Sequence, residues 1–170
     1  MTSSSFVVGE LNRLRALDGR WVILSSIPGG RKGAAIDQLV IGPGGVFAIN
    51  ARRRAGARAW GGGDLRSGRD EAHRVARILT AMTRICVRVQ GLIVPVGTQA
   101  EAVKQSSNIV KVVTSSALVD YLLGQPAYLD GAAIARIAGY ARLSSTWSVS
   151  PEGSLDAGRS QGEYGRPSAF

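Results

Sequence analysis

The sequence predicts an α/β protein with a mixed central β-sheet and helices on its faces. Segments with apolar residues at helical spacing alternate with short runs rich in Val and Ile, in the order α-β-β-β-α-β-β-α-α. The runs on either side of Gly42-Pro43-Gly44-Gly45 are apolar on both faces, which is typical of central strands that helices cover. The 170 residues, 45% of them hydrophobic, suffice for one domain with a sizeable core.

The first half of the chain predicts one helix and three strands. An apolar stripe at helical spacing, preceded by serines, predicts a helix over residues 6–17. Runs rich in β-forming residues predict strands over 21–27, 35–41 and 46–50. Because Gly42-Pro43-Gly44-Gly45 is a strong turn signal, we expect the last two strands to form a hairpin.

The second half predicts a further helix, two strands and two more helices. Apolar residues at helical spacing predict a helix over 70–84, after a bend at the glycines 61–63. Strands are predicted over 92–96 and 109–113. Ser115 or Ser116 is expected to cap a helix that ends at Leu123, and Asp130 one that ends at Arg142.

Composition divides the chain into a domain and a tail, and it limits the classes of protein to consider. After Trp147 the chain turns to Ser, Gly, Pro and charged residues, so we expect a domain over 1–147 and a disordered tail over 148–170. No apolar run approaches ~20 residues, so no membrane span is predicted. The lone Cys86 excludes an internal disulfide, and the start of the chain does not resemble a secretory signal. We therefore expect a cytoplasmic protein.

The charge of the chain is strongly positive. Lys and Arg number 21 against 12 Asp and Glu, for a net charge of +9. Arginine supplies most of the excess, and its guanidinium binds phosphate oxygens through two parallel hydrogen bonds. This balance fits a nucleic acid as partner. The alternative is a compositional bias toward arginine, as in a genome rich in G and C.

The predicted hairpin carries the candidate chemistry. Asp37 lies in its first strand, and Asn50 and Arg52 lie at the end of the second, so a carboxylate, an amide and a cation should be neighbours. Metal-dependent phosphodiester hydrolysis uses a similar set, but with a second carboxylate and a lysine. A structural alternative for Asp37 is a core carboxylate paired with Arg52.

Several segments together resemble the NERD domain, the nuclease-related domain of the PD-(D/E)-x-K nuclease-like superfamily, in its actinobacterial branch. The resemblance runs from about Gly9 to Trp147. The segments that carry it are Gly9-Glu10, Ile36-Asp37-x-Leu39-Val40-Ile41-Gly42-Pro43-Gly44-Gly45-Val46-Phe47, Gly56-Ala57-Arg58-x-Trp60, Glu71-Ala72-x-Arg74-x-Ala76-x-x-Leu79, Ile137-Ala138-x-x-Ala141-Arg142 and Thr146-Trp147.

The resemblance implies a restriction-endonuclease-like core and assigns the site residues. Asp37 takes the place of the first carboxylate and metal ligand, and Glu10 that of the acid on the first helix. Asn50 stands in the place of the second acid, and Arg52 in that of the lysine. An amide adds no negative charge, and arginine cannot take a proton from water. The resemblance therefore implies weak Mg²⁺ binding at Asp37, and a site better suited to holding a phosphodiester than to cutting it.

Arginines near this site are the candidate DNA contacts. We expect Arg52, Arg53, Arg54 and Arg58, together with Arg74 and Arg77 on the helix predicted over 70–84, to form one positive face. A solvated strand edge is an equally good interpretation of the first three. The sequence thus favours a DNA-binding or DNA-processing domain with little or no nuclease activity. The alternatives are an active Mg²⁺-dependent nuclease and a protein-interaction module.

Overall fold

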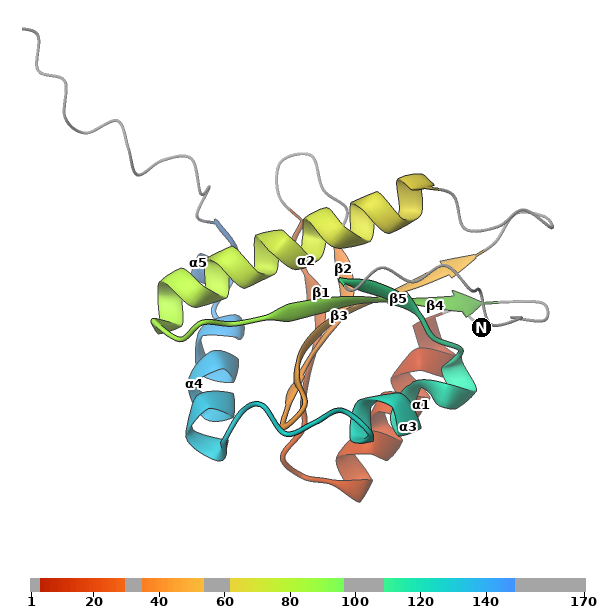
Figure 1. Ribbon diagram of the computed structural model, residues 1–170, viewed down its shortest axis with the longest axis horizontal. Helices are drawn as coiled ribbons and strands as arrows, with labels where there is room; N and C mark the ends of the chain where they lie inside the picture. The colour runs from red at the N-terminus through yellow and green to blue at the C-terminus, as the bar shows by residue number, and fades with distance from the viewer. Residues whose placement is uncertain (1–3, 30–34, 54–61, 97–108, 149–170) are drawn as a thin grey trace, which may run out of the picture.

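The computed structural model describes residues 4–29, 35–53, 62–96 and 109–148, and it shows an α/β protein with a five-stranded mixed sheet packed against helices (Figure 1). The elements follow the predicted order, with a 3₁₀ turn and a short last helix added. The expected cap at Ser115 or Ser116 is wrong, because both serines lie in the 3₁₀ turn and the helix that ends at Leu123 begins after Ala117 without a side-chain cap. They are α1 (Ser4–Leu17), β1 (Val22–Ile27), β2 (Ile36–Gly42), β3 (Gly45–Arg53), α2 (Gly62–Thr83), β4 (Val89–Val96), β5 (Val110–Val112), the 3₁₀ turn η1 (Ser115–Ala117), α3 (Leu118–Leu123), α4 (Gly131–Ala141) and α5 (Ser144–Ser148).

The strands lie in the sheet in the order in which they occur along the chain. β1, β2 and β3 pair antiparallel, whereas β3, β4 and β5 pair parallel. The predicted hairpin is confirmed: Gly42 faces Gly45 across the turn between β2 and β3. Gly45 has a φ of 124°, which is open to glycine but strained for other residues. A Cβ atom at Gly42 would overlap the ring of Trp21, so this position also requires glycine.

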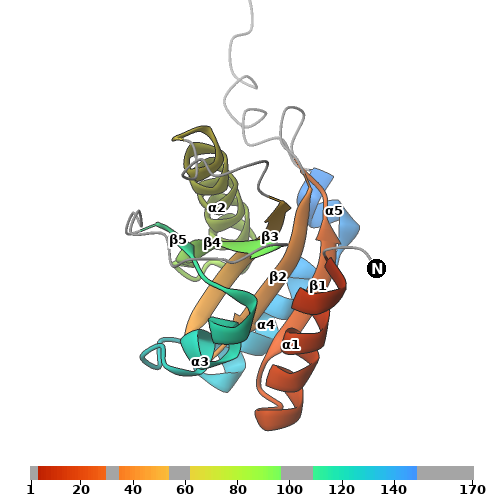
Figure 2. The same cartoon turned by 90° about the vertical axis from the view of Figure 1, so that its right-hand side faces the viewer.

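Helices cover both faces of the sheet (Figure 2). On one face α2, α4 and α5 enclose a core that includes Leu39, Leu79 and Ile137. On the other face α1 and α3 enclose a second core that includes Leu11 and Leu118. Because the middle strands are covered on both sides, their residues are buried almost without interruption, as the apolar runs of the sequence predict.

α2 begins at Gly62, eight residues before the predicted start at Asp70. The glycines at its start favour a bend, but tertiary packing decides the outcome. Leu65 packs against a small cluster with Ile93 and Val110. Gly68 lies so close to β4 that a Cβ atom on Gly91 would come within 3.1 Å of the Gly68 carbonyl oxygen. The first turns of α2 are therefore held directly against the parallel half of the sheet.

The end of the described chain differs from the prediction in one respect. Ser148, placed in the disordered tail, is the last residue of α5, a helix that was not predicted. Two side chains of α5 bind the last turn of α4: Trp147 Nε1 donates to the Ala141 carbonyl (2.9 Å) and Thr146 Oγ1 to the Tyr140 carbonyl (2.8 Å). The remainder of the predicted tail, 149–170, lies outside the described residues. No helix in the described ranges is long and apolar enough to cross a membrane.

Candidate functional site

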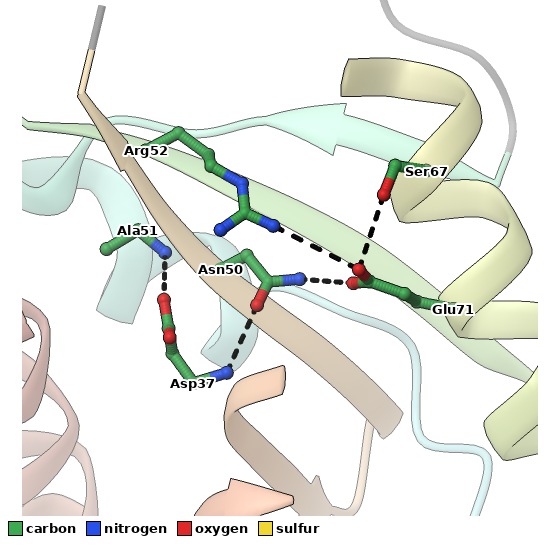
Figure 3. Close-up of polar contacts among 6 residues, drawn as sticks. All are labelled: Asp37, Asn50, Ala51, Arg52, Ser67 and Glu71. Atoms are coloured by element: carbon green, nitrogen blue, oxygen red, sulfur yellow. Dashed lines mark hydrogen bonds and ion pairs between the residues drawn. The ribbon is translucent and has the colours of Figure 1, made fainter. Parts of the chain in front are cut away.

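Asp37 and Asn50 lie opposite each other on β2 and β3, as predicted for adjacent strands. Their contacts do not follow the ordinary ladder. The Asp37 backbone N–H donates to Asn50 Oδ1 (3.1 Å), and the Ala51 backbone N–H donates to Asp37 Oδ2 (2.8 Å). Each of the two side chains thus accepts a backbone N–H of the neighbouring strand, where a regular ladder would use a backbone carbonyl (Figure 3). The carboxylate and the amide are consequently fixed by the sheet itself.

An irregularity in β1 accompanies this arrangement. Ser25 pairs with Gln38 and Ile27 with Ile36, but the intervening pair, Ser26 with Asp37, is absent from the ladder. Ser26 has a φ of 56°, in the left-handed region that a residue with a side chain seldom adopts. The sheet is therefore distorted on the β1 side of Asp37 as well as on the β3 side, and such local strain gathers at functional sites.

Asn50 also connects the hairpin to α2. Its Nδ2 donates to Glu71 Oε2 at 2.6 Å, and Ser67 Oγ donates to the other carboxylate oxygen at 3.4 Å. Figure 3 shows the amide of Asn50 between Asp37 on one side and Glu71 on the other. Asn50 is 3% exposed and Glu71 5%. Glu71 is the one charged residue in the described part of the chain that is buried, and burying a carboxylate is costly unless it is paired or used.

The charges around Glu71 only partly compensate its burial. Desolvation raises the pKa of Glu71, while the hydrogen bond from Asn50 and the nearby Arg52 act in the opposite direction. A guanidinium nitrogen of Arg52 lies 4.0 Å from Glu71 Oε1. Arg74, one turn further along α2, also attracts this carboxylate, and desolvation lowers the pKa of Arg74 itself. The site thus holds one buried negative charge beside two partly buried arginines.

The structure separates the predicted site residues into two groups. Asp37, Asn50 and Arg52 form one network, but Glu10 takes no part in the hydrogen bonds of that network. Glu10 lies on α1, which covers the face opposite α2, and its carboxylate contacts Arg13 at 3.4 Å. Glu10 is therefore not joined to the Asp37, Asn50 and Arg52 network by a hydrogen bond, and its site role stays a prediction.

The predicted DNA-contacting arginines also differ from one another. Arg53 and Arg77 are exposed, at the end of β3 and on α2. Arg74 is not on the outer face as expected: it is half-buried and donates to the Pro28 carbonyl at 2.6 Å, so it supports the structure between α2 and the end of β1. Arg54 and Arg58 lie outside the described residues.

The sequence interpretation missed Glu71 as a site residue, although the signal was present. Residues 71, 75, 78 and 79 fall on one face of a helix, and the other three are apolar and buried. An acid within an apolar helical stripe marks a buried carboxylate that needs a partner. Its partner, Asn50, lies 21 positions earlier, and only the fold shows that the two meet.

Comparison with known proteins gives no further assignment. No protein-family model, curated protein or solved structure matches the chain. The chemistry of this site must therefore be inferred from its own geometry.

Proposed function

We propose that the chain is a nuclease-related domain, with a restriction-endonuclease-like core, that binds DNA through its phosphates and cleaves it weakly or not at all. One observation carries the proposal. The residue in the place of the second acid, Asn50, is a neutral amide with both ends engaged: Oδ1 accepts from the Asp37 backbone and Nδ2 donates to Glu71. The Asn50 side chain therefore offers a cation no negative charge, and its amide oxygen already accepts one hydrogen bond.

The side chains present fit Mg²⁺ poorly. Magnesium prefers hard oxygen ligands in octahedral geometry and is usually bound by one or two carboxylates together with water and phosphate. Asp37 offers a half-buried carboxylate, but one of its oxygens accepts the Ala51 N–H. Within the described ranges no three His, Cys, Asp or Glu side chains are grouped so that they could hold a metal ion. We therefore derive no cleavage step through a bound metal.

Cations at the end of β3 support the binding half of the proposal. Arg52 is partly exposed, with a third of its side chain accessible, and Arg53 is exposed. The Arg52 guanidinium can hold a phosphate oxygen, but a guanidinium does not serve as a general base. Among the described residues its nearest carboxylate, Glu71, is 4.0 Å away, so the guanidinium is attracted to Glu71 without a short, paired contact.

One feature favours the alternative of an active nuclease. Glu71 brings a second carboxylate to the same network, on α2 instead of on the strand. If this carboxylate served a metal together with Asp37, Arg52 would have to move away from it. That alternative makes a distinct prediction, namely cleavage that depends on Mg²⁺ and on both acids.

The test measures DNA binding and cleavage by the same preparations. Binding of a labelled 20-base-pair duplex is followed by fluorescence anisotropy from 50 to 200 mM NaCl. The double variant Arg52→Ala, Arg53→Ala should bind more weakly, and the slope of log affinity against log salt should fall by about 1.8, or roughly 0.9 for each phosphate that the variant no longer neutralises. Arg136→Ala, which removes one exposed charge from α4, is the control.

Equal affinity and equal slope for the Arg52/Arg53 variant and the unmodified chain would show that these charges are incidental. No DNA binding by any preparation would favour a protein-interaction module. In the cleavage arm, with Mg²⁺, Mn²⁺ or EDTA, we expect feeble cleavage or none. Robust Mg²⁺-dependent cleavage that Asp37→Ala abolishes would instead establish the active nuclease.

A further inference from the structure

An open groove of about 520 Å³ lies at the other end of β3 and β4 from Asn50. Its lining includes Gly45 and Phe47 at the start of β3, Arg88 and Gln90 around the start of β4, and His73 on α2. Arg52 lies five residues beyond Phe47 along β3, about 17 Å away in an extended strand. The groove is therefore separate from the candidate site, and its volume is within the range of small-molecule sites.

Two cation–tyrosine pairs stand at and beside this groove. The guanidinium carbon of Arg88 lies 5.7 Å from the ring centre of Tyr128, which also lines the groove. The Lys111 ammonium lies 5.7 Å from the ring centre of Tyr121. Tyr121 is joined to the groove by its hydroxyl, which donates to Gln90 Oε1 at 2.6 Å. One cation–tyrosine pair thus lines the groove, and a second is linked to it through Gln90; surfaces that bind single-stranded nucleic acid combine cations and aromatic rings in this way.

The ring of Tyr128 is held in place before any ligand arrives. The Tyr128 hydroxyl donates to the Cys86 carbonyl at 2.8 Å, and the backbone N–H of Tyr128 donates to the Pro43 carbonyl at 2.7 Å. The side chain of Tyr128 is thus anchored at both ends, yet the residue remains 44% exposed. A ring fixed in this way loses little conformational freedom when a ligand stacks against it or against the Arg88 guanidinium.

The charge of the groove is positive and is not neutralised by its own lining. None of the described residues that line it is acidic. Among the described residues, neither Arg88 nor Lys111 forms an ion pair with a carboxylate. The groove therefore offers a cation for an anionic group beside a planar surface for an aromatic one. Gln90, whose Oε1 is taken by Tyr121, can donate through Nε2 to a carbonyl oxygen on a ligand.

We infer that this groove binds a nucleotide, with its base stacked on the Arg88–Tyr128 pair and its phosphate beside Arg88. Guanidinium planes and aromatic rings both stack on bases, and a guanidinium edge also binds phosphate oxygens. A nucleotide can come from two sources, a free mononucleotide or a single strand of nucleic acid. The inference does not depend on the proposed function, since no residue of the Asp37–Asn50–Glu71 network takes part in it.

The probes are thymidine monophosphate and a labelled hexamer of deoxythymidine, which has no duplex structure. Arg88→Ala should weaken binding of at least one of the two probes by about 5-fold to 150-fold, the range expected for loss of the stacking of one base. Arg88→Lys keeps the charge but not the plane, so it should lose most of the affinity while the salt dependence stays. Tyr128→Leu should weaken binding more than Tyr128→Phe, which keeps the ring. Arg136→Ala, an exposed arginine outside the groove, should change affinity less than 2-fold.

The outcomes separate the two sources and the two sites. Weakened binding of the monophosphate assigns the groove to free nucleotides; weakened binding of the hexamer alone assigns it to single strands. Unchanged binding of both probes to folded Arg88→Ala refutes the inference, and so does equal displacement of the hexamer by polyglutamate, which carries charge but no base. Arg52→Ala is measured in parallel: loss of hexamer binding in that variant alone would overturn the groove and leave the proposed function intact.

Discussion

The contact between Asn50 and Glu71 predicts how the protein responds to a carboxylate at position 50. Asn50→Asp changes one NH₂ group to an oxygen and leaves the size of the side chain almost unchanged. It places that oxygen where Nδ2 now lies 2.6 Å from Glu71 Oε2. Both residues are buried, so water cannot screen the new pair of like charges. We therefore expect Asn50→Asp to be destabilising at neutral pH, although it supplies the acid that the proposed relationship to nucleases would place there.

The magnitude is limited by proton uptake. Two full charges at that distance repel by about 6 kcal/mol at an effective dielectric constant of about 20. Binding one proton at pH 7 costs less, about 3 kcal/mol for a carboxyl group whose ordinary pKa is 4.5. The pair should therefore share a proton in the folded state, with a loss of about 3 kcal/mol of stability. For a domain of this size that corresponds to a fall in Tm of about 6–12 °C.

The pH dependence follows from the sign of the shift. The folded variant binds a proton that the unfolded chain has released, so its stability falls as pH rises from about 4.5 toward neutrality. Thermal unfolding followed by circular dichroism at pH 4.5, 6 and 7.5 measures this. The difference in Tm from the unmodified protein should be large at pH 7.5 and small at pH 4.5.

The control exchanges the two groups. In the double variant Asn50→Asp, Glu71→Gln, an amide again faces a carboxylate, and most of the lost stability should return. An unchanged Tm for Asn50→Asp at pH 7.5, or no recovery in the double variant, would show that these side chains do not meet as described. The double variant also places the acid on the strand without the repulsion, so it is the form in which to look for stronger Mg²⁺ or Mn²⁺ binding.

Three further perturbations follow from contacts described above. Burial raises the pKa of Glu71, so the unmodified protein should lose stability as pH rises above 4.5. Glu71→Gln should lose less stability between pH 5 and pH 7.5, as measured by urea unfolding. Equal losses of stability in the two proteins would contradict the buried charge. Asp37→Asn keeps an acceptor for the Ala51 N–H and should lower the free energy of unfolding by less than about 1 kcal/mol. Asp37→Leu leaves that N–H without its acceptor and should lower it by about 1–3 kcal/mol more. Similar urea midpoints for the two variants would refute the role of this bond. Gly42→Ala drives a methyl group into the Trp21 ring and should lower the free energy of unfolding by about 3 kcal/mol or more. The control is Gly139→Ala on α4, which has nothing near its added Cβ atom and should be neutral or stabilising. Comparable Tm values for the two variants would rule out the overlap.

Local signals in the sequence predicted the framework of the fold. The turn at 42–45 fixed the hairpin, because few other residues reverse a chain so tightly. Asp130 was expected to cap a helix, and its side chain accepts from the Ala133 N–H at 2.8 Å. The same hairpin brings Asp37 and Asn50 together, so that half of the candidate site could also be predicted.

The parts that could not be predicted depend on contacts between distant segments. α2 starts early because Leu65 and Gly68 pack on strands that occur later in the chain. Arg74 looks like a surface cation in the sequence, yet it reaches the Pro28 carbonyl, 46 positions away. Helical spacing could have identified Glu71 as buried, but not which residue it would meet. The strength and chemistry of the site are thus set by tertiary packing that no local pattern encodes.

The close approach of Gly68 to Gly91 makes the site sensitive to mutations that touch none of its polar atoms. The added methyl group of Gly91→Ala would press on the Gly68 carbonyl and displace α2 by a few tenths of an ångström. Ser67 and Glu71 are carried on the same turns of that helix, so the displacement would lengthen the short bond to Asn50. A substitution at Gly91 should therefore change the pH dependence of stability that Glu71 confers before it abolishes folding. A bulkier residue at position 91 would leave every site residue unchanged in the sequence and still alter their contacts.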